Sequence, residues 1–117
     1  MNAPKQPVTV ILVNNDGMGK STVDLQHIVA EKYFGLLAAH DLLPAAICFY
    51  TDGVRLVCEG SPVLDHLRAL EAKGVHLIVC QTCLDHLDLN DKLRVGIVGG
   101  MPDIIDAQWR ADKVITI

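Results

Sequence analysis

Short apolar runs alternate with longer amphipathic segments along the whole chain. Unbroken runs rich in β-branched residues are typical of strands that are buried on both faces of a sheet. The predicted strands are residues 8–13, 45–50, 75–80, 95–98 and 113–117. Strands and helices that alternate at this pace predict a mainly parallel sheet of about five strands with helices on both faces, an α/β fold.

The segments between these strands carry the start and stop signals of helices. The helix predicted over residues 22–42 follows Ser21 and Asp24, a pair that resembles a capping box. We expect its apolar positions to form one buried face: Leu25, Ile28, Val29, Leu36 and Leu37. A second helix begins at Ser61 and Pro62. Its expected buried stripe is Val63, Leu64, Leu67 and Leu70. Residues 84–93 are predicted to form a helix or a short segment rich in turns, and the last helix is predicted over residues 102–110.

Three loops follow the predicted strands at their carboxyl ends: residues 14–20, 51–60 and 81–85. In an open parallel sheet, ligands and reactive groups gather at this edge. The candidate chemistry of the chain is therefore expected in these loops.

Composition narrows the classes of protein that remain. The 117 residues, half of them hydrophobic, fit one domain over residues 1–117 with a core of its own. The net charge is −4 and only 4% of residues are aromatic, so the basic patch and stacking surface of a nucleic-acid binder are missing. No apolar stretch approaches the roughly 20 residues of a membrane span, and residues 1–7 do not resemble a secretory signal. We therefore expect a cytoplasmic protein whose cysteines are reduced, with no nucleic-acid or membrane partner.

The strongest candidate for chemistry is the sequence Cys80-Gln81-Thr82-Cys83, where the third strand ends and a helix begins. A helix N-terminus at Cys83 would expose its sulfur and lower its pKa below the value of about 8.5 for a free cysteine. Cys83 is thus the candidate reactive thiol, and Cys80 is its neighbour or resolving partner. The alternative, that both are small apolar core residues, stays open at this point.

Other functions of the same motif are less well supported by the chain. A thioredoxin-like site needs antiparallel strands that this order of elements lacks. A zinc site at Cys80, Cys83 and His86 lacks a second pair, because Cys48 and Cys58 lie ten residues apart and are interpreted as core cysteines. A redox sensor would pair the two motif cysteines, but strand geometry is expected to direct their side chains apart. No metal or organic cofactor is therefore predicted.

The loop from Asn14 to Ser21 resembles a phosphate-binding loop, but Asn14 stands where the first glycine is required. Nucleotide hydrolysis is not predicted for this reason. The favoured interpretation is a turn between strand and helix, in which glycine supplies a positive φ. The loop could also hold an anion at a helix N-terminus, with Lys20 nearby.

Three motifs in this order resemble a known family: Asn15-Asp16-Gly17-Met18-Gly19, then Gly53-Val54-Arg55-Leu56 before Glu59-Gly60-Ser61, then Cys80-Gln81-Thr82-Cys83-Leu84-Asp85. They resemble the DsrE/DsrF-like family, and most nearly the C-terminal domain of YedF-type sulfurtransferase-like selenium metabolism proteins. The resemblance runs from about Val8 to Ile117 and departs from the family at Gln81, where glycine is commonest.

This resemblance implies a three-layer α/β/α sandwich of the DsrE-like, flavodoxin/Rossmann-like kind, assembled into trimers or hexamers. It also implies a sulfur-relay or sulfurtransferase-like protein that holds sulfane sulfur as a persulfide on Cys83. Donor and acceptor would be thiol or persulfide proteins such as a TusA-like protein. We assign Cys83 and Cys80 as catalytic, and the following as substrate-binding: Asp16, Gly17, Met18, Gly19 and Thr82. The alternative is a non-catalytic oligomeric module that binds a small anion or nucleotide in the same cleft.

Overall fold

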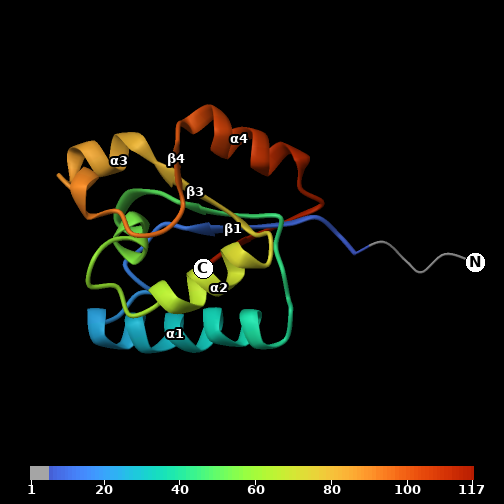
Figure 1. Cartoon of the computed structure of the whole chain (residues 1–117), viewed down its shortest axis with the longest axis horizontal. Helices are drawn as coiled ribbons and strands as arrows, with labels where there is room; N and C mark the ends of the chain where they lie inside the picture. The colour runs from blue at the N-terminus through green and yellow to red at the C-terminus, as the bar shows by residue number, and fades with distance from the viewer. Residues whose placement is uncertain (1–5) are drawn as a thin grey trace, which may run out of the picture.

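Five parallel strands form one sheet in the order β4-β3-β2-β1-β5 (Figure 1). The computed structural model describes residues 6–117. The strands are β1 (Thr9–Val13), β2 (Ala46–Phe49), β3 (His76–Cys80), β4 (Ile97–Gly99) and β5 (Lys113–Thr116). Each paired neighbour in this order runs parallel, which confirms the predicted sheet.

Helices cover both faces of this sheet, so the predicted three layers are confirmed. Figure 1 shows α1 (Val23–Ala39) and α2 (Leu64–Ala72) on one side of the strands, with α3 (Gln81–His86) and α4 (Met101–Arg110) on the other. Two short 3₁₀ helices, η1 (Thr51–Val57) and η2 (Asn90–Lys92), lie in the connections. No helix within residues 6–117 is long and apolar enough to cross a membrane.

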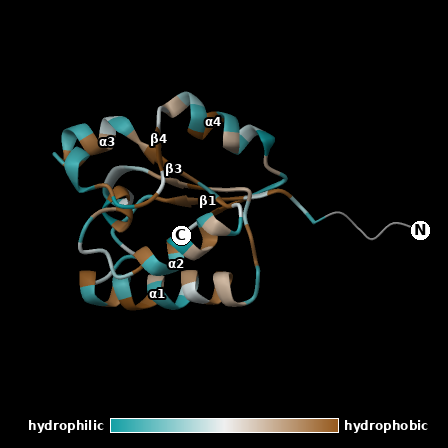
Figure 2. Cartoon of the chain, viewed as in Figure 1, coloured by the Kyte–Doolittle hydropathy of each residue, from teal (hydrophilic) through white to brown (hydrophobic). Residues whose placement is uncertain are grey.

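The core lies around the three central strands, where apolar side chains are buried on both faces of the sheet. Every residue of β2 is buried, as are four of the five residues of β1 and of β3. Figure 2 shows these strands as a hydrophobic centre between helices of mixed character. The edge strand β4 differs, because Ile97 and Val98 are exposed.

Helix α1 buries a different face from the one predicted. Its buried residues are Gln26, Ala30, Phe34 and Ala38, which recur every fourth position. Of the five residues predicted to be buried, Leu37 is only partly buried. The other four are exposed: Leu25, Ile28, Val29 and Leu36. The helix is apolar around much of its circumference, so the spacing of its apolar residues is compatible with two different buried faces. The observed face places the small residues Ala30 and Ala38 on either side of Phe34, and all three side chains are buried in the core.

The loop predicted over residues 51–60 contains a short helix, because residues 51–57 form η1. Val54, Leu56 and Val57 on this short helix are fully buried, so it is part of the core. The third helix begins earlier than predicted, at Gln81, and ends at His86. The turn that caps the carboxyl end of the sheet is consequently tighter than the sequence pattern indicated.

Candidate functional site

The two cysteines of the Cys-x-x-Cys motif meet at the carboxyl end of β3. Strand β3 ends at Cys80 and α3 begins at the next residue, so one helical turn carries Cys83 back over Cys80. Their Sγ atoms are 3.1 Å apart, and both thiols are free. The expectation that strand geometry separates these side chains is therefore wrong, because the strand geometry stops at Cys80 itself.

The two sulfurs differ in accessibility. Cys80 is 2% exposed, whereas Cys83 is partly exposed and packs at the margin of the core. Cys83 is thus the sulfur of the pair that an incoming thiol can reach.

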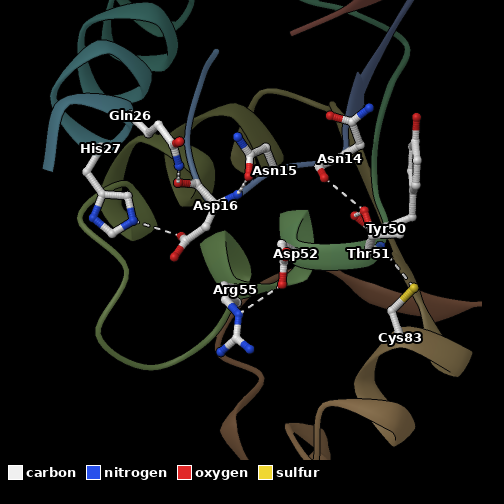
Figure 3. Close-up of polar contacts among 10 residues, drawn as sticks. All are labelled: Asn14, Asn15, Asp16, Gln26, His27, Tyr50, Thr51, Asp52, Arg55 and Cys83. Carbon is white, nitrogen blue, oxygen red and sulfur yellow. Dashed lines mark hydrogen bonds and ion pairs between the residues drawn. The ribbon is translucent and has the colours of Figure 1, made fainter. Parts of the chain in front are cut away.

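Thr51 supplies the polar contact to the Cys83 sulfur, as Figure 3 shows. Its backbone N–H donates to Cys83 Sγ at 3.0 Å. Its hydroxyl lies 2.8 Å from the carbonyl oxygen of Asn14 and 2.7 Å from that of Tyr50. Thr51 therefore links the segments that follow β1, β2 and β3: it contacts Asn14 through its hydroxyl and Cys83 through its backbone.

Thr51 adopts a conformation that β-branched residues rarely take. Its φ is 48°, in the left-handed region that costs an L-residue roughly 1–2 kcal/mol. Such strain persists where surrounding contacts fix the backbone, and functional sites are common locations. Sequence analysis marked the loop but missed Thr51, since a threonine directly after a strand carries no signal of a left-handed turn.

Gly53 fixes the turn that presents this N–H group. The Gly53 N–H donates to the carbonyl oxygen of Tyr50 at 3.0 Å, and the Tyr50 N–H donates to that of Val13 at 3.0 Å. A side chain on Gly53 would collide with the Val13 carbonyl group. Glycine is required here because two backbones approach closely, and this approach holds Thr51 beside α3.

The pKa of Cys83 is raised, contrary to the expected lowering at a helix N-terminus. Burial is the largest cause, followed by the hydrogen bond to Cys80, which stabilises the protonated thiol. The Thr51 N–H acts in the opposite direction because it stabilises the thiolate. Burial also favours the protonated thiol at two other cysteines. It raises the pKa of Cys48 to about 11 and also raises the pKa of Cys58.

The loop between β1 and α1 is a turn held by its own hydrogen bonds. Gly17 and Gly19 have φ values of 122° and 77°, so the predicted glycine turn is confirmed. The buried Gln26 amide accepts from the Ser21 N–H and donates to the Asp16 carbonyl, both at 2.9 Å. These contacts explain why a polar residue occupies the buried face of α1.

The predicted substrate-binding residues fall in two places. Figure 3 shows the Asp16 carboxylate directed at His27, with Oδ1 and Nε2 2.8 Å apart. Thr82 lies exposed on the first turn of α3, next to Cys83. The remaining members, Gly17, Met18 and Gly19, belong to the β1–α1 turn. Their role in substrate binding stays a prediction.

An open hollow of about 560 Å³ lies beside this turn. Its lining includes Asn14, Asn15, Lys20 and Ser21, so one cation and several polar groups face it. The contact of Thr51 with the Asn14 carbonyl connects this hollow to the cysteine site. Among residues 6–117, no cluster of three or more His, Cys, Asp and Glu side chains is arranged to hold a metal ion.

The sequence of the chain matches the model of the DsrE/DsrF-like family over residues 8–117. The chain belongs to the DsrE/DsrF-like family. This family is associated with sulfur relay. No curated protein matches the chain. The finer likeness to YedF-type proteins stays a prediction.

Solved structures share the DsrE-like fold with the chain. The YchN protein of E. coli is 21% identical with a TM-score of 0.71, and the match covers 96% of this chain and 100% of that one. The protein of unknown function MTH1491 from Methanobacterium thermoautotrophicum is 20% identical with a TM-score of 0.64, covering 93% and 97%. The conserved protein of unknown function BT1422 from Bacteroides thetaiotaomicron is 13% identical with a TM-score of 0.63, covering 94% and 95%.

Proposed function

We propose that this DsrE/DsrF-like protein is a sulfur-relay carrier that holds sulfane sulfur as a persulfide on Cys83. The observation that carries the proposal is the placement of its four cysteines. Cys48, Cys58 and Cys80 are buried, whereas Cys83 is partly exposed at the carboxyl edge of the sheet and receives the Thr51 N–H. The family's association with sulfur relay agrees with a thiol in this position.

Loading follows from thiol–disulfide exchange chemistry. The Cys83 thiolate attacks the outer sulfur of a donor persulfide, and the bond between the two donor sulfurs breaks. The donor leaves as a thiolate, and Cys83 carries the outer sulfur. An acceptor thiolate then attacks that sulfur and releases Cys83. Sulfane sulfur moves in both steps without an external oxidant or reductant.

The surroundings of Cys83 suit a carrier that both accepts and releases sulfur. The Thr51 N–H stabilises the thiolate that attacks in the first step and leaves in the second. A raised pKa reduces the thiolate fraction at neutral pH but increases the intrinsic nucleophilicity of the thiolate that forms. Loading by this thiolate is therefore expected to accelerate with increasing pH.

Partners of this carrier would be thiol proteins that donate and accept persulfide sulfur, such as a TusA-like protein, in a homo-oligomer of three or six chains. The edge strand β4 and the adjoining α4 support assembly, because they expose apolar side chains beside a strand edge that has no partner among residues 6–117. These side chains are Ile97, Val98, Met101, Ile105 and Trp109. Sedimentation of the protein beside an Ile97→Lys variant tests this surface, and a wild-type monomer would contradict the proposal.

The relay is tested by following one sulfur atom through both steps. The reduced protein is treated with glutathione persulfide, desalted without delay and divided between immediate intact mass measurement and addition of an acceptor thiol. We expect a mass gain of one sulfur atom that the acceptor thiol removes. Cys83→Ser should not gain the sulfur. Cys58→Ser, which removes a buried thiol instead, should load normally.

Equal loading of wild type and Cys83→Ser would overturn the assignment of Cys83. Absence of loading in every variant would overturn the carrier function. The remaining candidate would then be the binding module for a small anion, which the hollow beside Lys20 supports. Calorimetric titration of wild type and Lys20→Ala with inorganic phosphate and ATP measures that alternative directly.

A further inference from the structure

Cys80 is a nucleophile that the relay leaves unused. Its sulfur is 3.1 Å from Cys83 Sγ, and its side chain is 2% exposed. Because the side chain is enclosed at the end of β3, protein thiols in solution cannot approach it. The atom that Cys80 can attack is therefore the sulfur of Cys83.

We propose that Cys80 resolves the Cys83 persulfide by forming a Cys80–Cys83 disulfide and releasing sulfide. The proposal rests on the proposed function, because it requires that Cys83 carry the persulfide. It adds a second fate for the bound sulfur: transfer to an acceptor, or release as sulfide when no acceptor arrives. The protein would thus have a sulfide-releasing activity.

The step balances within the protein. Cys80 Sγ attacks Cys83 Sγ, the inner sulfur of the persulfide, and a bond forms between the two cysteines. The bond from Cys83 Sγ to the outer sulfur breaks, and the outer sulfur leaves as hydrosulfide. Hydrosulfide takes up the proton lost by the Cys80 thiol and is released as H₂S. The sulfane sulfur is reduced to sulfide while the two cysteine thiols are oxidised to the disulfide. A dithiol reductant is then needed to restore the reduced protein.

The geometry of the reduced site favours this reaction. A disulfide has an S–S distance of about 2.05 Å, so the sulfurs must approach by roughly 1 Å. Cys80 is the last residue of β3 and Cys83 lies in the first turn of α3, so the proposed bond requires the two side chains to close this separation. An intramolecular nucleophile held at contact distance reacts as though it were present at very high concentration.

The order of the two cysteines also points to an internal resolving role. The first residue of the motif is enclosed and the second is reachable, so an external sulfur compound meets Cys83 before Cys80. The hydrogen bond from the Cys83 thiol to Cys80 Sγ shows that the two groups already face each other in the reduced protein. Loading at Cys83 would therefore always place the inner sulfur against Cys80.

The test follows the fate of the loaded sulfur over time in the absence of oxygen and acceptor. Wild-type protein is treated with glutathione persulfide, desalted at once, and sampled for intact mass and free sulfide. We expect the mass to fall from one sulfur above the reduced protein to two hydrogens below it, with one sulfide released per chain. Peptide mapping should place the disulfide between Cys80 and Cys83.

Cys80→Ala and Cys80→Ser remove the resolving thiol, and Cys48→Ser is the matched control for loss of a different buried thiol. Both Cys80 variants should load but keep the sulfur at least about tenfold longer than wild type, because the internal nucleophile is absent. The Cys48→Ser protein should release sulfide at the wild-type rate. Far-UV circular dichroism before loading confirms that each variant is folded.

The outcomes separate this inference from the relay itself. If wild type and the Cys80 variants hold the persulfide equally long without sulfide release, the resolving role is wrong and the relay stands. If Cys83 loads in none of these proteins, both proposals are wrong. A glutathione adduct on Cys83 in the Cys80 variants would show that the disulfide forms through a mixed disulfide, which would overturn the persulfide step.

Discussion

Cys48 and Cys83 are both free thiols, but Cys48 lies within strand β2 and Cys83 lies in α3, just beyond the end of β3. Cys48 is fully buried among apolar strands, and burial raises its pKa to about 11. Cys83 is partly exposed and receives a backbone N–H that stabilises the thiolate. Two residues of the same type therefore differ in reactivity because one has a route to solvent and a hydrogen-bond donor.

Cys58 shows that positive charge near a thiol is not enough to make it reactive. Arg55 and Arg94 lower the pKa of Cys58, but burial is the larger effect and raises it. Its side chain is 2% exposed, like that of Cys80. What distinguishes Cys80 is its contact with a reachable sulfur, which gives a buried thiol a possible role in chemistry.

The largest effect is expected at Gly53, whose substitution would disturb the site through the backbone. In Gly53→Ala the new methyl group collides with the Val13 carbonyl, so we expect a loss of about 3 kcal/mol in the free energy of unfolding. Displacement of Thr51 should also slow loading of Cys83 while Cys48 stays inert. Urea unfolding and intact mass measure the two effects.

The matched control is Gly35→Ala, where the added methyl group meets the movable ring of His66 rather than backbone. Its free energy of unfolding should stay within about 1 kcal/mol of wild type, because helix propensity offsets the contact. Equal destabilisation by the two substitutions would contradict the role assigned to the Gly53–Val13 approach.

Exchanging sulfur for oxygen at Cys48 and at Cys83 should give opposite results. Cys48→Ser buries a hydroxyl among apolar strands and should cost about 2 kcal/mol of stability, with loading unchanged. Cys83→Ser lies at the margin of the core and should cost less than about 1 kcal/mol, yet abolish loading. Thermal unfolding measures the stability of both variants, and intact mass spectrometry measures their loading. A loading defect in Cys48→Ser would contradict this prediction.

A comparison of two substitutions at Thr51 isolates the effect of backbone strain, because both remove the hydroxyl group. Thr51→Ala and Thr51→Gly both lose the contact with the Asn14 carbonyl, but glycine also relieves the left-handed conformation. We expect the glycine variant to be more stable than the alanine variant by about 1 kcal/mol. The reverse order of urea midpoints would show that Thr51 is not strained.

The smallest expected effect is a shift in the pH dependence of Cys83 alkylation. Burial and Cys80 favour the protonated thiol, so the rate should still rise above pH of about 8.5, where a free cysteine is half ionised. In Cys80→Ala the hydrogen bond that favours the thiol is lost, so the midpoint should move to lower pH. A midpoint for wild type below that of a free cysteine would contradict the electrostatics described above.

Much of the fold could be predicted from local pattern. The unbroken apolar runs at β1, β2 and β3 identify strands covered on both faces, and their alternation with helices predicts the parallel sheet. The buried face of α1 could not be predicted in the same way, because Leu25 and Ile28 are as apolar as the residues that pack inward. Tertiary packing in the core buries Ala30 and Phe34 instead.

The site was predictable in position but not in geometry. The spacing of Cys80 and Cys83 and the end of the third apolar run located the thiols. The Thr51 N–H reaches Cys83 across 32 residues of sequence, so this contact depends on the register of β2 and β3 rather than on any local motif. The 3.1 Å approach of the sulfurs likewise required the immediate start of α3.

The most direct test of the account is to map sulfur among all four cysteines of the wild-type protein. The protein is loaded with a single equivalent of glutathione persulfide, trapped at early times with an alkylating reagent that preserves the added sulfur, and digested for peptide mass spectrometry. The account predicts the additional sulfur on the peptide of Cys83, with Cys48 and Cys58 unmodified. Sulfur first appearing on Cys58 or Cys48, with Cys83 unmodified, would contradict it.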